Sequence, residues 1–149
     1  KVSLCYGYGL QVTLIQLIGA YTALFSNGQF QGLNLISDSY NGFEDKVISE
    51  EIAMEIKDML SEAVNTGTGR KALVKNTKII GKTGTTKIST NQGYTERSFN
   101  ASFVGMAELK DKDFVLGILV REAKENGEGG GQVAAPVFSE IIKSIKNTL

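Results

Sequence analysis

The spacing of apolar residues changes twice along this chain, and the order of these changes limits the folds that it can adopt. Apolar side chains recur every three or four residues in 13–26 and in 49–67, which predicts two helices. The same spacing returns in 136–149, where Pro136 is expected in the first turn of a last helix. Few polar residues remain on the first helix, so it is expected to lie buried among its neighbours.

The stretch before the last helix has the composition of strands. Three segments near 77–87, 99–109 and 113–122 are rich in β-branched and aromatic residues, and the polar loop KDKD between the last two suits a hairpin. These segments predict three successive antiparallel strands, with a longer polar loop between the first two. The order helix, helix, three strands, helix is typical of an α+β fold with helices packed on an antiparallel sheet.

Length and composition exclude several classes of function. The 149 residues suit one domain, and the 16 basic and 16 acidic residues give a formal net charge of zero, so nothing indicates nucleic-acid binding or an electrostatic membrane patch. The absence of histidine removes Ser-His-Asp and Cys-His catalysis and histidine metal sites. The single cysteine, Cys5, cannot form an internal disulfide and is expected to be buried. We expect no cofactor, no metal and no membrane span.

The segment IIGKTGTT, residues 79–86, is the first candidate for chemistry. A phosphate loop needs GxxxxGK[ST] between a strand and a helix, but Asn76 stands at the first glycine position and no convincing helix follows. Residues 67–72, GTGRKA, match the dinucleotide pattern GxGxxA, but they follow a predicted helix, so a glycine cap and turn is favoured. Arg70 and Lys71 there fit either a small anion site or two solvated cations.

If 79–86 forms an exposed edge strand, it can contact an extended ligand. Lys82 would direct a cation toward the site, and Thr83 would add a hydroxyl. Gly84 would leave space for a peptide-like ligand to lie against the backbone. Thr85 would offer its backbone N–H to a developing oxyanion. Taken alone, Lys82 also fits an ordinary solvated lysine.

Five elements in a fixed order make the sequence resemble the C-terminal half of a penicillin-binding protein transpeptidase domain. They are a glycine-flanked start of the first helix, a turn, a KTG strand, the strand after it and the start of the last helix: YGYGLQVTLIQLIGAYTALFSNG, AVNTGTGRKALV, GKTGTT, ASFVGMAEL and GGGQVAAPVFSEII. Leu14 departs from the family pattern, which usually has proline there. The last element is similar to the class B type, which acts in division or elongation.

The resemblance implies a partial β-lactamase and transpeptidase-like fold, with residues 1–149 as the C-terminal portion of one domain. In this family a serine in SxxK is acylated by the penultimate D-alanine of a peptidoglycan stem peptide or by a β-lactam, and a second serine lies in SxN. The resemblance implies that Lys82 places positive charge near the SxN serine, that the Thr83 and Thr85 hydroxyls hold the substrate carboxylate, and that the Thr85 amide completes the oxyanion hole. Gly84 completes the motif.

Neither SxxK nor a correctly placed SxN occurs in this chain. Lys143 comes one position too late after Ser139, and Ser98-Phe99-Asn100 is formally SxN but follows KTG instead of preceding it. Ser37-Asp38-Ser39 does not complete either motif. The chain is therefore expected to supply the KTG strand of an enzyme without its nucleophile, and to be inactive alone.

The start at Lys1, with neither a methionine nor a signal peptide, suits an excised or mature piece, or a targeting segment outside the sequence. The resemblance implies a location in the periplasm or on the outer face of the cytoplasmic membrane, together with other cell-wall synthesis proteins. Exposed apolar surface, especially at 113–122, is expected to recruit the N-terminal half of the domain or a second copy. The alternative is a noncatalytic α+β module that binds a peptide or partner along an exposed strand edge.

Overall fold

The computed structural model describes residues 9–33, 44–90, 93–110, 112–124 and 129–149, and it confirms the α+β fold. The predicted helices and strands occur in the predicted order, and two short strands and one 3₁₀ turn were not predicted. The helices are α1 (Leu14–Phe25), α2 (Glu50–Asn65) and α3 (Gly130–Thr148), with η2 (Arg70–Ala72) as the 3₁₀ turn. The strands are β1 (Gln29–Gln31), β2 (Glu44–Lys46), β3 (Ile79–Thr90), β4 (Gly93–Leu109) and β5 (Lys112–Lys124).

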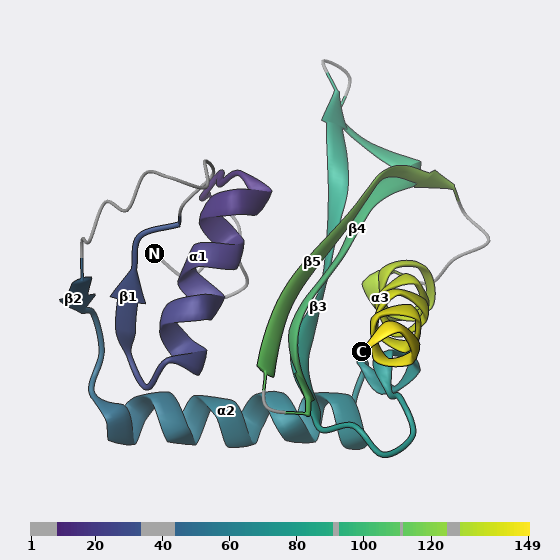
Figure 1. Cartoon of the computed structure of the whole chain (residues 1–149). Helices are drawn as coiled ribbons and strands as arrows, with labels where there is room; N and C mark the ends of the chain where they lie inside the picture. The colour runs from purple at the N-terminus through teal and green to yellow at the C-terminus, as the bar shows by residue number, and fades with distance from the viewer. Residues whose placement is uncertain (1–8, 34–43, 91–92, 111, 125–128) are drawn as a thin grey trace.

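The main sheet has the strand order β3-β4-β5 and is antiparallel throughout. Figure 1 shows α1 on one side of this sheet, α3 on the other, and α2 running across its base. The strands β1 and β2 form a separate two-stranded sheet beside α1. Because β4 lies in the middle, β3 and β5 are the two edges of the main sheet.

Apolar side chains alternate between the two faces of the sheet and build two clusters. The larger cluster lies between the sheet and α3, where the rings of Phe103 and Phe138 meet edge to face at 4.8 Å. The smaller cluster joins Ile80 and Met106 to Leu60 of α2 and to the aromatic end of α1. The two clusters cover both faces of the sheet at Ile79 and Ile80. They therefore hold β3 in place just before the KTG segment.

The sequence signals for helix ends are confirmed. Thr13 and Gln16 form a capping box, in which Thr13 Oγ1 accepts from Gln16 N at 3.2 Å and Gln16 Oε1 accepts from Thr13 N at 2.9 Å. At the end of α2, the N–H groups of Gly67 and Gly69 donate to carbonyls of the last turns of the helix, at 3.2 and 2.9 Å. Residues 67–72 are therefore a helix end and turn, and the dinucleotide interpretation is not supported.

The boundaries of three predicted elements were wrong. The polar stretch after KTG belongs mainly to extended strands, since β3 runs to Thr90 and β4 begins at Gly93. The last helix begins at Gly130, so Pro136 lies inside α3 instead of in its first turn. Gly129, with φ of +76°, provides the reversal that lets the helix begin early. Pro136 removes one helical hydrogen bond, but α3 continues because its apolar face packs on the sheet.

The expectation that α1 lies buried among its neighbours is met only in part by the described residues. Only Gly19 and Ala23 of this helix are buried, and Ile15 is 49% exposed. The contacts of α1 are with β1, α2, β4 and β5, and no other described element covers its remaining surface. Its high apolar content therefore leaves an exposed apolar face, which continues to Leu10 and Val12.

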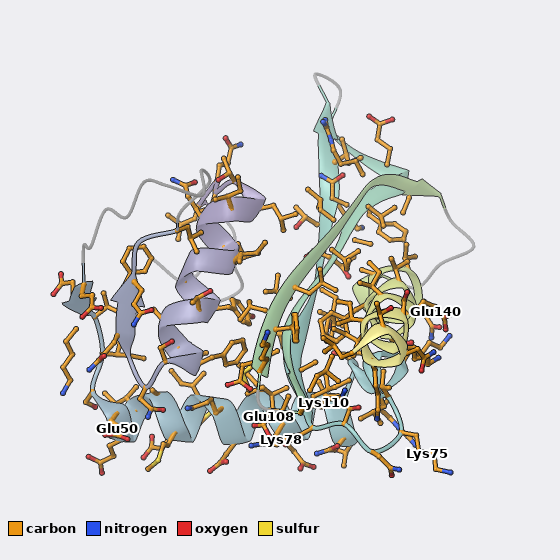
Figure 2. The ribbon with its side chains drawn as sticks, in the orientation of Figure 1. Glu50, Lys75, Lys78, Glu108, Lys110 and Glu140 are labelled. Carbon is orange, nitrogen blue, oxygen red and sulfur yellow. The ribbon has the colours of Figure 1, made fainter. Side chains whose placement is uncertain are left out.

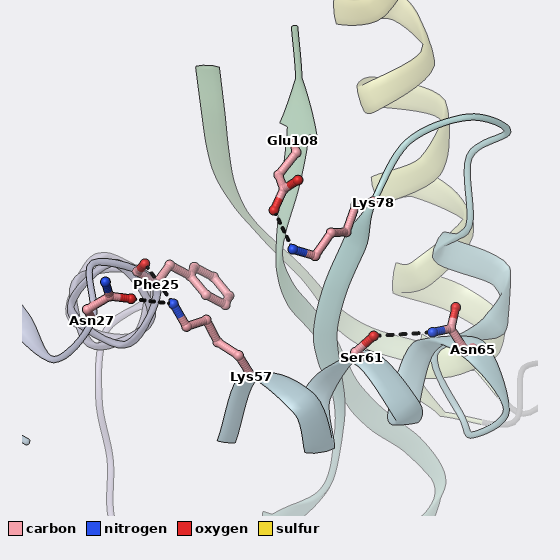
Figure 3. Close-up of polar contacts among 7 residues, drawn as sticks. All are labelled: Phe25, Asn27, Lys57, Ser61, Asn65, Lys78 and Glu108. Carbon is pink, nitrogen blue, oxygen red and sulfur yellow. Dashed lines mark hydrogen bonds and ion pairs between the residues drawn. The ribbon is translucent and has the colours of Figure 1, made fainter. Parts of the chain in front are cut away.

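Polar contacts fasten the elements at the base of the sheet. Lys57 of α2 donates from Nζ to Asn27 Oδ1 at 2.6 Å and to the Phe25 carbonyl at 3.4 Å, which ties α2 to the end of α1 (Figure 3). Lys78 and Glu108 form an ion pair of 2.7 Å between the start of β3 and the end of β4 (Figures 2 and 3). These contacts fasten α2 to the end of α1 and the start of β3 to the end of β4.

We expect Lys146→Met to lower the free energy of unfolding by about 1.5–3 kcal/mol, the range for hydrogen bonds to a charged group. Lys146 Nζ donates to Lys75 O, Asn76 O and Thr77 Oγ1 at 2.7 to 2.9 Å and so holds the loop that leads into β3. Denaturant unfolding of the domain that carries this chain would measure the change. Lys143→Met is the matched control on the same helix, because it removes only an exposed ion pair worth at most about 1 kcal/mol. Equal effects of the two substitutions would contradict this role of Lys146.

Candidate active-site strand

The KTG segment lies on an edge strand whose unpaired side exposes backbone groups. Glu108 N donates to Lys78 O at 3.1 Å just before β3, and the register with β4 is unbroken over 79–87. In an antiparallel pair, hydrogen-bonded and non-hydrogen-bonded positions alternate, so the odd-numbered residues of β3 are the non-hydrogen-bonded ones. The N–H and C=O groups of Thr83 and Thr85 therefore point to the open edge, where no other described strand pairs with β3.

Lys82 carries an exposed ammonium group that lies along this edge. Because side chains alternate between faces, the Lys82 side chain leaves β3 on the face opposite to Thr83 and Thr85. Its Nζ nevertheless donates to Thr83 O at 3.2 Å and to Thr83 Oγ1 at 3.3 Å. The Lys82 side chain thus bends around the edge of the strand. Its charge lies beside the outward carbonyl and the hydroxyl of Thr83.

The Thr83 hydroxyl is fixed from the turn that follows α2. Thr68 Oγ1 and Thr83 Oγ1 are 2.7 Å apart and share one hydrogen bond. On the other side of the turn, a Cβ on Gly131 would clash with the Thr68 carbonyl, so the start of α3 packs directly on this turn. The orientation of Thr83 consequently depends on the turn after α2 and on the start of α3 that packs against this turn.

The Thr85 hydroxyl is fixed by the first residue of α3. Gly130 N donates to Thr85 Oγ1 at 2.9 Å. A hydroxyl has one proton to donate and two lone pairs to accept with, so this contact leaves the Thr85 O–H proton free to donate to an acceptor. Gly129 must also be a glycine here, because a Cβ on it would clash with Thr85 Oγ1.

Gly84 lacks a side chain at a point where Ser102 of the paired strand comes close. A Cβ on Gly84 would clash with Ser102 Oγ on the paired strand. On the α3 side, a Cβ on Gly130 would lie 2.6 Å from the Gly84 carbonyl oxygen, so the helix start already touches the strand backbone. The start of α3 thus contacts the Gly84 backbone on one face of the strand, while Ser102 Oγ lies on the opposite face, on the side of the missing Cβ.

A cavity of about 560 Å³ opens beside the KTG segment, between the turn and the start of α3. Lys71 Nζ donates to Gln132 Oε1 across it, which joins the turn to α3. No acidic side chain is among its lining residues. These are Gly67, Thr68, Arg70, Lys71, Thr83, Thr85, Gly130, Gly131 and Gln132.

The structure brings the four predicted site residues together, and it adds residues that the sequence did not indicate. Thr68 and Gly130 contact the two site threonines, and neither of them was a predicted site residue. A GKT segment that continues as a straight strand cannot surround a phosphate, so the phosphate-loop interpretation is not supported. Ser98 lies in β4 opposite Lys124, whereas Cys5 and residues 37–39 lie outside the described residues.

Neither a metal-binding cluster nor a membrane-spanning helix is found in the part of the chain that the structure describes. Within it, no group of three or more His, Cys, Asp or Glu side chains could hold a metal ion. None of its helices combines the length and apolar content needed to span a bilayer.

The arrangement of an open KTG edge, two oriented threonine hydroxyls and a glycine-rich helix start agrees with a comparison against known families. The family model of the penicillin-binding protein transpeptidase domain matches residues 2–143. This chain belongs to that family. The match confirms the family expected from the five sequence elements.

Individual members of the family support this assignment. The peptidoglycan D,D-transpeptidase FtsI of Buchnera aphidicola is 34% identical over 97% of this chain, and the match covers 26% of that protein. The chain thus spans about a quarter of that relative's length. The relatives FtsI and penicillin-binding protein 3 are of the class B type, which is the type expected from the sequence.

Solved structures of the family share the fold. The transpeptidase domain of Burkholderia pseudomallei penicillin-binding protein 3 is 35% identical, with a TM-score of 0.84, over 97% of this chain and 45% of that chain. Penicillin-binding protein 3 of Mycobacterium tuberculosis, solved in complex with aztreonam, has a TM-score of 0.84 at 24% identity, over 98% of this chain and 37% of that chain, and shows the fold alone.

Proposed function

We propose that residues 1–149 form the C-terminal portion of one transpeptidase domain and supply the KTG wall of a peptidoglycan D,D-transpeptidase. The full-length protein would cross-link cell-wall stem peptides and would be acylated by β-lactams. One observation carries the proposal: the outward N–H of Thr85, the hydroxyls of Thr83 and Thr85, and the Lys82 ammonium all lie at one open strand edge. An extended peptide can add to such an edge through backbone hydrogen bonds.

Each site residue has a role that its geometry supports. The Thr85 N–H would donate to the oxyanion that forms when the nucleophile attacks the scissile carbonyl, because this N–H is not used by β4. The Thr83 and Thr85 hydroxyls would hold the substrate carboxylate. Lys82 would stabilise negative charge at the same edge, and the absence of a side chain on Gly84 would let Ser102 Oγ lie close to β3.

The names of the relatives support the substrate class. The FtsI relative is named a peptidoglycan D,D-transpeptidase, and the Mycobacterium tuberculosis protein was solved with aztreonam bound. We therefore propose stem peptides and β-lactams as the ligands of the full-length protein. We also propose that it acts in the periplasm or on the outer face of the cytoplasmic membrane, among other cell-wall synthesis proteins.

The nucleophile of this reaction would lie outside the chain. Ser98 follows KTG and belongs to β4, so it does not match the family's SxN serine. The exposed apolar face of α1 and the edge strand β5, on which Leu119 is 46% exposed, would then be covered by the N-terminal half of the domain or by a second copy. Light scattering with intact-mass measurement would test this, and a stable monomer of the isolated chain would contradict it.

Labelling with fluorescent penicillin tests the proposed function. We expect the full-length protein to form a covalent adduct that survives denaturing electrophoresis, and the isolated chain of residues 1–149 to form none. Covalent labelling of the isolated chain would show that the nucleophile lies within it. A full-length protein that also fails to label would instead support a noncatalytic module that binds a peptide along the open edge of β3.

A further inference from the structure

Arg70 is a cation that the proposed reaction has not yet used, and it lines the same cavity as Thr83 and Thr85. Its side chain is exposed. Among the described residues, no carboxylate forms an ion pair with it, and no hydrogen bond of its guanidinium group is found. A guanidinium group that faces a cavity without a partner is available to a ligand.

The backbone on both sides of Arg70 is held in place. Gly69 N donates to Ala63 O at 2.9 Å and Ala72 N donates to Gly69 O at 2.8 Å, which fixes the turn and η2 on the end of α2. Ala72 is fully buried in the core between the sheet and α3. The backbone that carries Arg70 is therefore held in place, while its side chain is exposed.

The surroundings of Arg70 favour a negatively charged ligand. The cavity contains two cations and no acidic side chain, and α3, a helix of 19 residues, begins at its wall with the positive end of its dipole. Lys71 Nζ donates to the neutral amide oxygen of Gln132. This hydrogen bond holds the Lys71 side chain in place but does not neutralise its charge. Arg70 is the cation in this cavity that is free to move to a ligand.

We propose that Arg70 is a specificity-determining residue that forms an ion pair with the terminal carboxylate of the substrate, in the cavity that the threonine side chains also line. This inference rests on the proposed transpeptidase function. The planar guanidinium group offers two parallel N–H donors that match the two oxygens of a carboxylate. A ligand with a free carboxylate is then preferred over the same ligand with that group esterified.

The test compares acylation of the full-length protein by benzylpenicillin and by its methyl ester, which lacks the negative charge. For Arg70→Gln we expect the second-order acylation rate constant to fall by about 10- to 100-fold with the acid, the loss that matches one charged hydrogen bond. With the ester, we expect a change below about 2-fold, because no ion pair is lost. Arg70→Lys should recover part of the rate with the acid.

Two controls separate this role from a structural one. Arg121→Gln removes the same charge from β5, outside the cavity lining, and should leave both rate constants unchanged. In the unsubstituted protein, acylation by the acid should slow as ionic strength rises, and Arg70→Gln should show a weaker dependence.

The possible results are distinct. Equal losses with acid and ester would assign Arg70 a structural role, and unchanged rates with both would show that it is only a solvated cation; either result overturns the inference but leaves the proposed function standing. If the unsubstituted full-length protein reacts with neither compound, the proposed function fails, and the inference about Arg70 fails with it.

Discussion

Replacing Lys82 by alanine in the full-length protein is expected to slow acylation by fluorescent penicillin by about 100- to 1000-fold, the size of effect seen when one charge-stabilising group is removed from an acyl-transfer site. The ammonium group lies 3.2 Å from the outward carbonyl of Thr83 and 3.3 Å from its hydroxyl. It therefore places positive charge where the substrate would bind. The measurement is the rate of adduct formation over time, resolved by electrophoresis.

The control for Lys82→Ala is the same substitution at a nearby lysine, Lys78. Lys78→Ala removes an exposed cation from the segment that leads into the same strand, where the ion pair with Glu108 contributes at most about 1 kcal/mol to stability. Lys78→Ala should leave the acylation rate near that of the unsubstituted protein. Because Lys82 is exposed, its removal should also leave thermal unfolding nearly unchanged. An undiminished rate for Lys82→Ala would contradict the role proposed for this strand.

Gly130→Ala is expected to lower both stability and acylation. The new Cβ would lie 2.6 Å from the Gly84 carbonyl oxygen and would clash with the Ser102 carbonyl, and neither backbone group can move without displacing a strand. We expect a loss of about 1–3 kcal/mol in the free energy of unfolding, typical of overpacking. The displaced helix start would also release the Thr85 hydroxyl, and a displacement near 1 Å at a site can slow a reaction by about 10- to 100-fold.

Gly19→Ala is the matched control, because it makes the same change in a helix where the nearest atoms belong to side chains instead of backbone. A Cβ on Gly19 would lie 3.3 Å from the Phe30 ring and 3.4 Å from the Leu33 side chain, so a movement of a few tenths of an ångström would accommodate it. The gain in helix propensity should offset this contact, so stability should stay the same or rise by up to about 1 kcal/mol. Chemical denaturation and penicillin labelling of both variants would measure the difference. A Gly130→Ala protein that unfolds and labels like the Gly19→Ala protein would refute the packing argument.

The fold could be predicted largely from local sequence signals. Thr13 and Ser49 mark helix starts with side-chain caps that depend on residues only three positions away. The extent of β3 and β4 could not be predicted, because polar residues such as those after Thr86 form strands there only through pairing with each other. The start of α3 was missed for a similar reason, since a proline is usually a sign of a helix start and here it lies on a helix stabilised by the sheet.

The residues of the candidate site could be predicted only in part. Those that could not be predicted are far from the KTG segment in the sequence. Lys82, Thr83, Gly84 and Thr85 are consecutive, so a motif reveals them. Thr68 lies 15 positions before Thr83, and Gly130 lies 45 positions after Thr85, so only tertiary structure brings them into contact. One sequence signal was available: a glycine in each of positions 129–131 suggests close backbone contacts as well as a flexible loop.

The position of the Lys82 ammonium has a second consequence, for solubility. An exposed edge strand is a template on which another chain can pair, and lysine side chains along an edge are a common natural protection against aggregation. By donating to the outward carbonyl of Thr83, Lys82 occupies a hydrogen-bonding group that an unrelated strand would need. Lys82, which is proposed to assist acylation, would thus also prevent unrelated strands from pairing with the edge of β3. A ligand would have to displace the ammonium group from the Thr83 carbonyl to align there.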